Sequence, residues 1–337
     1  MASIRFRWSG FWQRSTALLV LLVAAVGLLA LLFAAELRGQ VITSRTVKLI
    51  VNYPAGSGTA DMLARFMSEW LAHKWMRPVV VENIPGLTGR IGAEAVYGAE
   101  PDGHTLLVTP PGAMTFARHL PSLAYDPQQF IAVSLLATIP IVLVARSDLP
   151  ASNLVELLAH ARQSRDRLKI AHQGAGSMSH LTAEWFRLAT ALDVVHVPFR
   201  GSVAALQGLG DGRVDLMFDN LGSSLGAITS GQVKALAVAS RTREPSLPGL
   251  PTVAELLPDF ESSTWIAVVA PPKTPRHIAG ALNADFVEGL SDPAIATRFR
   301  QSGCEPARMT PEATAVFLQS ESEKWTKVVT TKGFRFE

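Results

Sequence analysis

Hydrophobic and polar positions alternate along most of this chain in two distinct patterns. Short apolar runs rich in β-branched residues predict strands, and stretches with apolar residues three and four positions apart predict helices. The predicted strands span 47–51, 78–81, 105–108, 139–144, 169–171, 194–197, 216–218, 235–239 and 266–269. The predicted helices span 61–73, 89–99, 154–163, 179–188, 203–209, 275–289, 293–301 and 311–328. Strands that alternate with helices predict an α/β fold with mostly parallel sheets.

The first 40 residues form a different kind of segment. Arg5, Arg7 and Arg14 precede an apolar run over 16–35, as in a signal peptide that directs export. The run approaches the roughly 20 residues that span a bilayer, and no good cleavage site with two small residues follows it. A retained membrane anchor with its N-terminus in the cytoplasm therefore stays open beside a cleaved signal. In both cases the rest of the chain is expected outside the inner membrane.

Composition narrows the possible functions. The 337 residues are 48% apolar, enough for two domains of ordinary size. Without residues 1–35, 28 basic residues balance 28 acidic ones, and no cluster of Lys and Arg with aromatic residues remains. A nucleic-acid partner is therefore not expected. The single Cys304 cannot form an internal disulfide, and the eight histidines lack metal-ligand spacing, so neither a metal nor a cofactor is predicted.

A glycine-rich turn, YPAGSGTAD over 53–61, lies between a predicted strand and a predicted helix. Unpaired N–H groups and the partial positive charge of a helix N-terminus attract anions. The turn lacks the third glycine of a dinucleotide fingerprint and the lysine of a phosphate loop. A small carboxylate, held by N–H and O–H donors alone, fits better than a polyphosphate. Asp61 would repel a highly charged phosphate, but it could cap its own helix or receive an amino group of a ligand.

Other turns have a related layout. KIAHQGAGSMSHLTAEWF, in the middle of the chain, repeats the order of strand, glycine-and-hydroxyl turn and helix. Two such units facing each other would frame a cleft between two α/β domains. The turns at Thr88–Gly89 and Arg200–Ser202 also precede predicted helices, and Asp219 follows the carboxyl end of a predicted strand, where ligands of α/β sheets bind.

Enzymatic motifs are weak in this sequence. The serine elbow G-x-S-x-G is absent, and the pair Ser177 and His180 is better explained as hydroxyl donors or helix caps than as nucleophile and base. No paired catalytic carboxylates can be identified. We therefore do not expect an enzyme.

Seven segments taken in order resemble the signature segments of the Bug family, the extracytoplasmic solute receptors of tripartite tricarboxylate transporters. They are VNYPAGSGTADMLARFM, PVVVENIPGLTGRIGAEAV, PDGHTLLV, VHVPFRGSVAAL, DLMFDNL, LPGLPTVAEL and EKWTKVV. The resemblance covers residues 45–337. It implies a type II periplasmic-binding-protein fold, with a first domain of 45–142 and 266–337, a second of 143–265, and two crossover strands between them.

The resemblance also implies a set of ligand contacts. The ligand would be a di- or tricarboxylate, an acidic amino acid or an aromatic carboxylate, bound between the domains without a metal. The implied contacts, all at turns before helices or at strand ends, are Tyr53, Gly56, Ser57, Gly58, Thr59, Asp61, Thr88, Gly89, Gly174, Gly176, Ser177, Ser179, His180, Phe199, Arg200, Gly201, Ser202 and Asp219. The family usually has Tyr-Lys-Gly where this chain has Phe199-Arg200-Gly201. This departure affects the ligand's identity more than its class, since arginine can hold a carboxylate in a bidentate manner.

Two functions follow from these patterns. The first is a periplasmic, monomeric receptor that closes on a carboxylate and delivers it to a two-component inner-membrane permease. The second is a sensor, periplasmic or anchored by residues 16–35, that has no permease and signals through another partner.

Overall fold

The computed structural model describes residues 26, 45–117, 123–164, 166–332 and 334. Residues 45–337 form one compact unit, separate from residues 1–44. The predicted signal or anchor segment lies almost entirely outside the described residues. Among the described residues, no helix is long and apolar enough to cross a membrane.

The unit is built on one sheet with the strand order β2-β1-β3-β9-β4-β7-β5-β6. At one end lie β1 (Val47–Val51), β2 (Val79–Asn83) and β3 (Thr105–Thr109), with β2 and β3 both parallel to β1. These strands and the short β10 (Glu305–Pro306) form what we call lobe 1. Because parallel strands end at the same edge, the turns after β1 and β3 lie side by side.

The other end of the sheet forms lobe 2. Here β5 (Leu168–His172) pairs in parallel with β6 (Val194–Pro198) and β7 (Leu216–Asn220). A further strand, β8 (Val233–Val238), pairs antiparallel with β4. The carboxyl ends of these parallel strands carry the second glycine-rich turn and the residues around Asp219.

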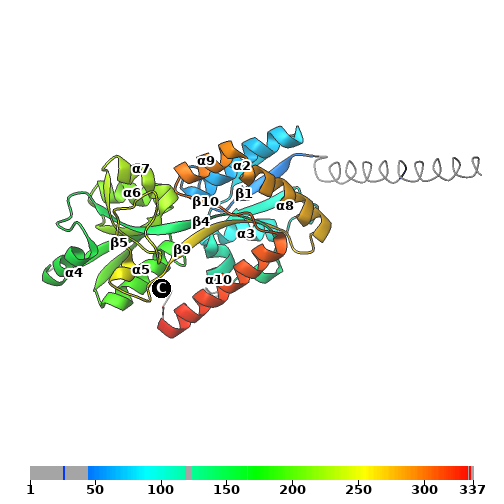
Figure 1. Ribbon diagram of the computed structural model, residues 1–337. Helices are drawn as coiled ribbons and strands as arrows, with labels where there is room; N and C mark the ends of the chain where they lie inside the picture. The colour runs from blue at the N-terminus through cyan, green and yellow to red at the C-terminus, as the bar shows by residue number, and fades with distance from the viewer. Residues whose placement is uncertain (1–25, 27–44, 118–122, 165, 333, 335–337) are drawn as a thin grey trace, which may run out of the picture. The chain divides into compact units, whose positions relative to one another are not determined.

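Two long antiparallel strands run between the lobes (Figure 1). β4 (Ile131–Arg146) pairs with β9 (Ser263–Ala270) along its first part and with β7 and β8 along its second. The pairing changes at Pro140, which opposes Ser263, and Ile141, which opposes Asn220. Proline has no N–H to donate, so this position suits a change of partner strand.

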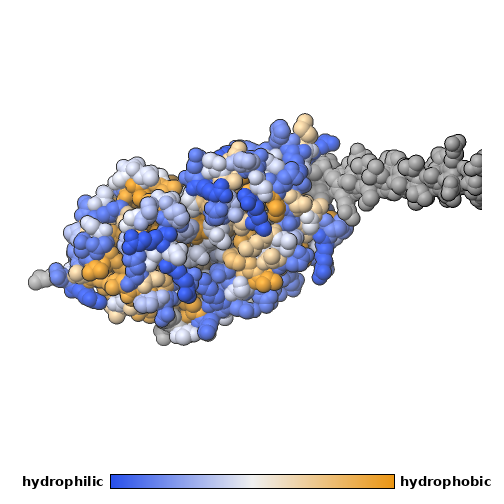
Figure 2. Space-filling model, viewed as in Figure 1, coloured by the Kyte–Doolittle hydropathy of each residue, from blue (hydrophilic) through white to orange (hydrophobic). Residues whose placement is uncertain are grey.

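Helices cover both lobes (Figure 1). Lobe 1 carries α2 (Thr59–Trp75), α3 (Arg90–Tyr97), α8 (Arg276–Ser291), α9 (Pro293–Gln301) and α10 (Pro311–Lys332). Lobe 2 carries α4 (Leu154–Gln163), α5 (Met178–Thr190), α6 (Ser202–Gly210) and α7 (Leu221–Thr229). A 3-10 turn, η1 (Leu87–Gly89), precedes α3, and a π-helical turn, η2 (Gly112–Phe116), follows β3. On the face in Figure 2, apolar residues form scattered groups among hydrophilic ones, as is usual for protein surfaces.

Each lobe has its own apolar core, and one helix contributes to both regions. The core of lobe 1 includes Ile50, Leu107 and Trp265. In the core of lobe 2, Trp325 of α10 packs edge-on against Trp185 of α5, with ring centres 6.0 Å apart. The last turns of α10 therefore rest on lobe 2.

The predicted α/β fold of the type II periplasmic-binding-protein kind is confirmed, and all predicted strands and helices exist, with ends shifted by a few residues. The expectation of a mostly parallel sheet is wrong, since five of the nine pairings among the described strands are antiparallel because β4 and β9 run against their neighbours. The pattern missed α7, β10 and the first half of β4. The glycine- and serine-rich segment LGSSLGAIT of α7 has a weak helical propensity, which explains its omission. The division into domains at 142/143 and 265/266 stays a prediction.

Candidate functional site

The turn after β1 touches lobe 2 directly. The Ser202 amide, at the start of α6, donates to the Ser57 carbonyl over 3.1 Å. The Thr59 amide donates to the Ser223 hydroxyl over 3.1 Å, and the hydroxyls of these two residues lie 2.8 Å apart. Gly201 permits this approach, because a Cβ there would lie 2.8 Å from the Ser57 Cβ. The turn 53–61 and the starts of α6 and α7 thus form one site.

A second contact joins the lobes at η1. The Thr88 hydroxyl donates to the Ala175 carbonyl over 2.8 Å. A Cβ on Gly174 would lie 3.0 Å from the Thr88 hydroxyl oxygen. Thr88 has a left-handed backbone (φ 56°), which a β-branched residue rarely adopts. The glycine-rich turn after β5 in lobe 2 therefore contacts η1 of lobe 1.

A small cavity of about 20 Å³ remains between the lobes at this site. It has room for about one water molecule. Six of the residues implied by the sequence resemblance line it together with five others; the eleven are Tyr53, Ser57, Gly58, Thr59, Ala60, Asp61, Pro110, Gln173, Ser202, Asn220 and Ile266. Burial raises the pKa of Tyr53 above its usual range, so its hydroxyl stays protonated and can donate a hydrogen bond.

Three helices begin at this cavity. α2 starts after Gly58, α6 after Gly201 and α7 after Asn220. Within the described part of the chain, none of these three N-cap residues makes a side-chain capping hydrogen bond. The first-turn N–H groups of a helix have no partner within it and carry partial positive charge. Helix N-termini attract anions, and three of them converge on this cavity, where the Thr59 and Ser202 amides donate to groups of the opposite lobe.

Asp61 stabilises the turn 53–61 through hydrogen bonds. Its carboxylate accepts from the Gly56 amide at 2.8 Å, from Asn83 at 2.8 Å and from Arg65 at 2.9 and 3.0 Å. Burial alone would raise the pKa of Asp61, but the hydrogen bonds from Arg65, Asn83 and Gly56 hold it below its ordinary value. Asn83 also donates to the Tyr53 carbonyl over 3.0 Å. Asp61 therefore shapes the turn, although it also lines the cavity.

Asp219 has a comparable role in lobe 2. Its fully buried carboxylate accepts from Gln173 at 2.6 Å and from Ser202 and Ser224 at 2.7 Å each. Gln173 also donates to the Ser202 hydroxyl over 2.8 Å. Burial raises the pKa of Asp219, against these hydrogen bonds. This network ties the end of β5 to the starts of α6 and α7, and so holds two of the three helix ends in place.

The other implied residues are not among those that line the cavity, and their contact with a ligand stays a prediction. Ser177 caps α5 by accepting from the His180 amide at 3.2 Å, and the Ser179 hydroxyl donates to the Phe218 carbonyl over 2.5 Å. Phe199 lies beneath the Arg213 guanidinium, and Arg200 is exposed. Three implied glycines make backbone hydrogen bonds to side chains: the Gly89 carbonyl accepts from Asn52, and the Gly174 and Gly176 amides donate to His172 and His180.

The sequence analysis missed Gln173 and Asn220, which line the cavity, and Ser223, which contacts Thr59 beside it. Gln173 lies between a strand end and a glycine turn, where a polar residue could have been suspected. Ser223 belongs to α7, a helix that the pattern did not predict, so nothing marked it. Gln173 lines the cavity and Ser223 contacts Thr59 beside it, because β5 and β7 lie side by side in the sheet.

Two α/β lobes, joined by long strands and holding helix N-termini around a cleft between them, define a solute-binding protein of the periplasmic type. The family model described as "Tripartite tricarboxylate transporter family receptor" matches residues 63–334, and the chain belongs to this family.

Relatives and solved structures agree with this assignment. The chain is 32% identical to protein BugT of Bordetella pertussis over 328 residues, covering 96% of this chain and 99% of BugT. Its fold is similar to that of Rpa4515 from R. palustris with adipate, at a TM-score of 0.82 and 33% identity, covering 86% of this chain and 97% of that one. It is also similar to MatC from Rhodopseudomonas palustris with bound malate, at a TM-score of 0.80 and 34% identity, covering 85% and 99%. The resemblance to the Bug family is thus confirmed.

Proposed function

We propose that this protein captures a small organic carboxylate in the periplasm and delivers it to a two-component permease of the inner membrane. The observation that carries the proposal is the convergence of the N-termini of α2, α6 and α7 on one cavity. Their amide groups offer hydrogen bonds and partial positive charge to an anion without a metal.

The lining of the cavity favours a carboxylate over a phosphate. No Lys or Arg is among the eleven described lining residues, and Asp61 adds a carboxylate of its own. A polyphosphate would need a cation there, whereas amides and hydroxyls suffice for one carboxylate group. Two family members about one third identical to this chain have adipate and malate bound, both of which are dicarboxylic acids. A di- or tricarboxylate is therefore our first expectation, followed by an acidic amino acid or an aromatic carboxylate.

Closure of the two lobes is the proposed binding step. The cavity of about 20 Å³ is far too small for such an acid, so the lobes must separate to admit it and then close around it. Hydrogen bonds to a charged group contribute about 1.5–3 kcal/mol each. Three or four of them approach the roughly 8 kcal/mol of a micromolar complex before the cost of ordering is subtracted. Such reversible binding suits a receptor that must release its ligand.

The proposed role is that of a receptor, with neither catalysis nor signalling. The family comprises receptors, and the polar side chains of the site are engaged in holding the turns rather than in an acid–base or nucleophilic arrangement. Delivery to a permease rests on the family description, and location in the periplasm rests on the family and on the export-like pattern of residues 1–35.

A thermal-shift screen of the full chain against organic acids tests the binding step. Malate, adipate, citrate, glutamate and benzoate would be used, since a ligand at 100 times its dissociation constant adds about 2.7 kcal/mol of stability. The acid that raises the melting temperature is then titrated by calorimetry against Thr59→Val and, as a control, Ser230→Ala. Ser230 lies exposed at the end of α7, away from the cavity.

We expect Thr59→Val to weaken binding about tenfold, and Ser230→Ala to leave it unchanged. A screen in which no carboxylate stabilises the protein, or equal affinity of Thr59→Val and the parent chain, would refute this site. Failure of the protein to support uptake despite tight binding would instead favour the sensor over the receptor.

A further inference from the structure

Three histidines that are distant in the sequence meet between α5 and the strands β5 and β6. His172 ends β5, His180 lies in the first turns of α5, and His196 lies in β6. Each offers a ring nitrogen, and these nitrogens all lie within 4.8 Å of one another. We call these residues the histidine cluster. It lies behind the glycine turn 173–177 and contributes nothing to the lining of the cavity.

The spacing of the rings suits a single metal ion. Zinc binds imidazole nitrogens at about 2.0–2.1 Å in a tetrahedral arrangement, which puts the centres of the rings about 5 Å apart. The ring centres of the cluster are 4.4 Å apart for His172 and His180, 5.1 Å for His180 and His196, and 5.8 Å for His172 and His196. The His172 and His180 rings are stacked, with their planes 29° apart, so these rings must turn and the ring nitrogens must draw together by about 1 Å to reach one ion.

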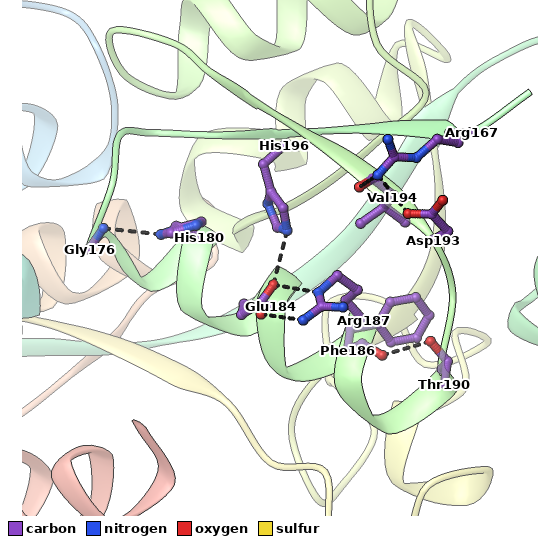
Figure 3. Close-up of polar contacts among 10 residues, drawn as sticks. All are labelled: Arg167, Gly176, His180, Glu184, Phe186, Arg187, Thr190, Asp193, Val194 and His196. Carbon is purple, nitrogen blue, oxygen red and sulfur yellow. Dashed lines mark hydrogen bonds and ion pairs between the residues drawn. The ribbon is translucent and has the colours of Figure 1, made fainter. Parts of the chain in front are cut away.

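A carboxylate orients one of the rings, as is common around metal-binding histidines. Nε2 of His196 lies 3.2 Å from the Glu184 carboxylate, which Arg187 holds with two hydrogen bonds of 2.7 and 2.8 Å. Figure 3 shows Glu184 between His196 and Arg187. The other nitrogen, Nδ1 of His196, is buried and has no hydrogen-bond partner among the described residues. An imidazole that donates Nε2–H to a carboxylate presents its Nδ1 lone pair to a metal.

We propose that His172, His180 and His196 bind one divalent ion of the zinc type, with Glu184 orienting His196 and an open fourth position for water. Three imidazoles suit zinc, copper, nickel and cobalt rather than magnesium or calcium, which prefer oxygen ligands. His196 lies in β6, the last strand of the sheet, and is only half-buried, so the cluster lies near the protein surface.

Occupation of this site has a consequence for the neighbouring glycine turn. The amides of Gly174 and Gly176 donate to Nδ1 of His172 and of His180, each over 3.2 Å (Figure 3 for Gly176). A neutral imidazole that binds a metal through Nε2 carries its proton on Nδ1, and one that binds through Nδ1 has used that lone pair. In either case the glycine amide loses its acceptor. The metal should therefore loosen the turn 173–177, which faces the cleft.

The test is a titration of the purified full chain, freed of metal by chelation, with zinc chloride and separately with cobalt chloride. We expect one ion per chain and the visible absorption of four-coordinate cobalt. His196→Gln should weaken binding at least about tenfold, and Glu184→Gln about 10–100-fold, as is typical when an orienting partner of a metal ligand is lost. His277→Gln is the matched control, because His277 is exposed on α8 and outside the cluster.

Each outcome decides the proposal. Circular dichroism shows whether each variant is folded. If His196→Gln is unfolded, the comparison of zinc affinities uses Glu184→Gln instead. Equal zinc affinity of the parent chain, Glu184→Gln and the folded His196→Gln overturns the site, as does the absence of binding by the parent chain. Faster amide exchange of residues 173–177 on addition of zinc supports the coupling, and unchanged exchange with bound zinc refutes it. None of these measurements uses the organic acid, so they succeed or fail independently of the receptor function.

Discussion

The Thr88 hydroxyl crosses the cleft and donates to the Ala175 carbonyl over 2.8 Å. Thr88 stands before α3 in lobe 1, and Ala175 lies in the glycine turn of lobe 2. The contact is made by a side chain on one side and a backbone group on the other, so it can be removed without altering lobe 2. Its removal therefore tests whether direct contacts between the lobes hold them closed.

Thr88→Val should shift the protein toward an open form. Valine has nearly the same shape and the same backbone restriction, so the main change is the loss of one hydrogen bond, about 0.5–1.5 kcal/mol. We expect a larger radius of gyration in small-angle X-ray scattering. Thr297→Val removes a hydrogen bond of 2.7 Å within α9 and serves as the control. An unchanged radius for Thr88→Val would mean that this contact does not hold the lobes together.

Gly201→Ala should hinder closure more than it harms folding. The new Cβ would lie 2.8 Å from the Ser57 Cβ in the opposite lobe, and the backbone there has φ 99°. Gly212→Ala is the control, because Gly212 also has a positive φ (68°) but has nothing within 4 Å of its Cβ position. We expect both variants to lose about 1 kcal/mol or more of unfolding free energy from backbone strain. A loss of carboxylate affinity is expected for Gly201→Ala alone, and equal losses in calorimetry would contradict the close approach.

Asp61→Asn should release the turn after β1. The substitution weakens the hydrogen bonds from Gly56 and Arg65, and bonds to a charged group are each worth about 1.5–3 kcal/mol. The pKa of Asp61 is lowered in the folded protein, so its contribution to stability is complete well above the unfolded value of about 3.9. That contribution is lost as the pH falls through the folded-state pKa.

Urea unfolding of both proteins over a range of pH measures this effect. The parent chain should exceed Asp61→Asn in unfolding free energy at neutral pH, and the difference should shrink below about pH 4. A difference that stays constant with pH would show that the ionised carboxylate is not what stabilises the turn.

Cys304 offers a probe of closure. It is buried, and burial raises its pKa to about 12, so its thiol should react slowly with Ellman's reagent at pH 8. Its sulfur lies near α7 of lobe 2, since a Cβ on Gly222 would come within 2.8 Å of it. We expect the bound carboxylate to slow the reaction further. A reaction rate unaffected by the ligand would indicate that Cys304 stays covered in the open form too.

Local features of the site could be predicted from the sequence because they depend on neighbours in the chain. In the sequence, the order of a strand pattern, glycines and a helix start predicted the turn 53–61. The same order predicted the turn after β5. The resemblance to the Bug family then implied that these turns face each other, and six of the implied residues do line the cavity. The role of Asp61 stayed open, since capping and binding require the same position in the sequence.

Contacts between distant segments could not be predicted in this way. Ser223 meets Thr59 across 164 positions, and Gln173 meets Asp219 across 46. The eight histidines show no ligand spacing, yet three of them converge because β5 pairs with β6 and α5 packs beside them.

By itself, the sequence determined which segments become strands and helices, and which turns bring unpaired amides to helix ends, because periodicity and glycine act within a few residues. Only the tertiary structure decided which of those helix ends share a cavity. It also decided which polar side chains make the hydrogen bonds that hold the surrounding turns in place. The physical reason is that a buried carboxylate or imidazole takes whichever partner the pairing of strands and the approach of the lobes bring within hydrogen-bond distance, and that partner is often far away in the chain.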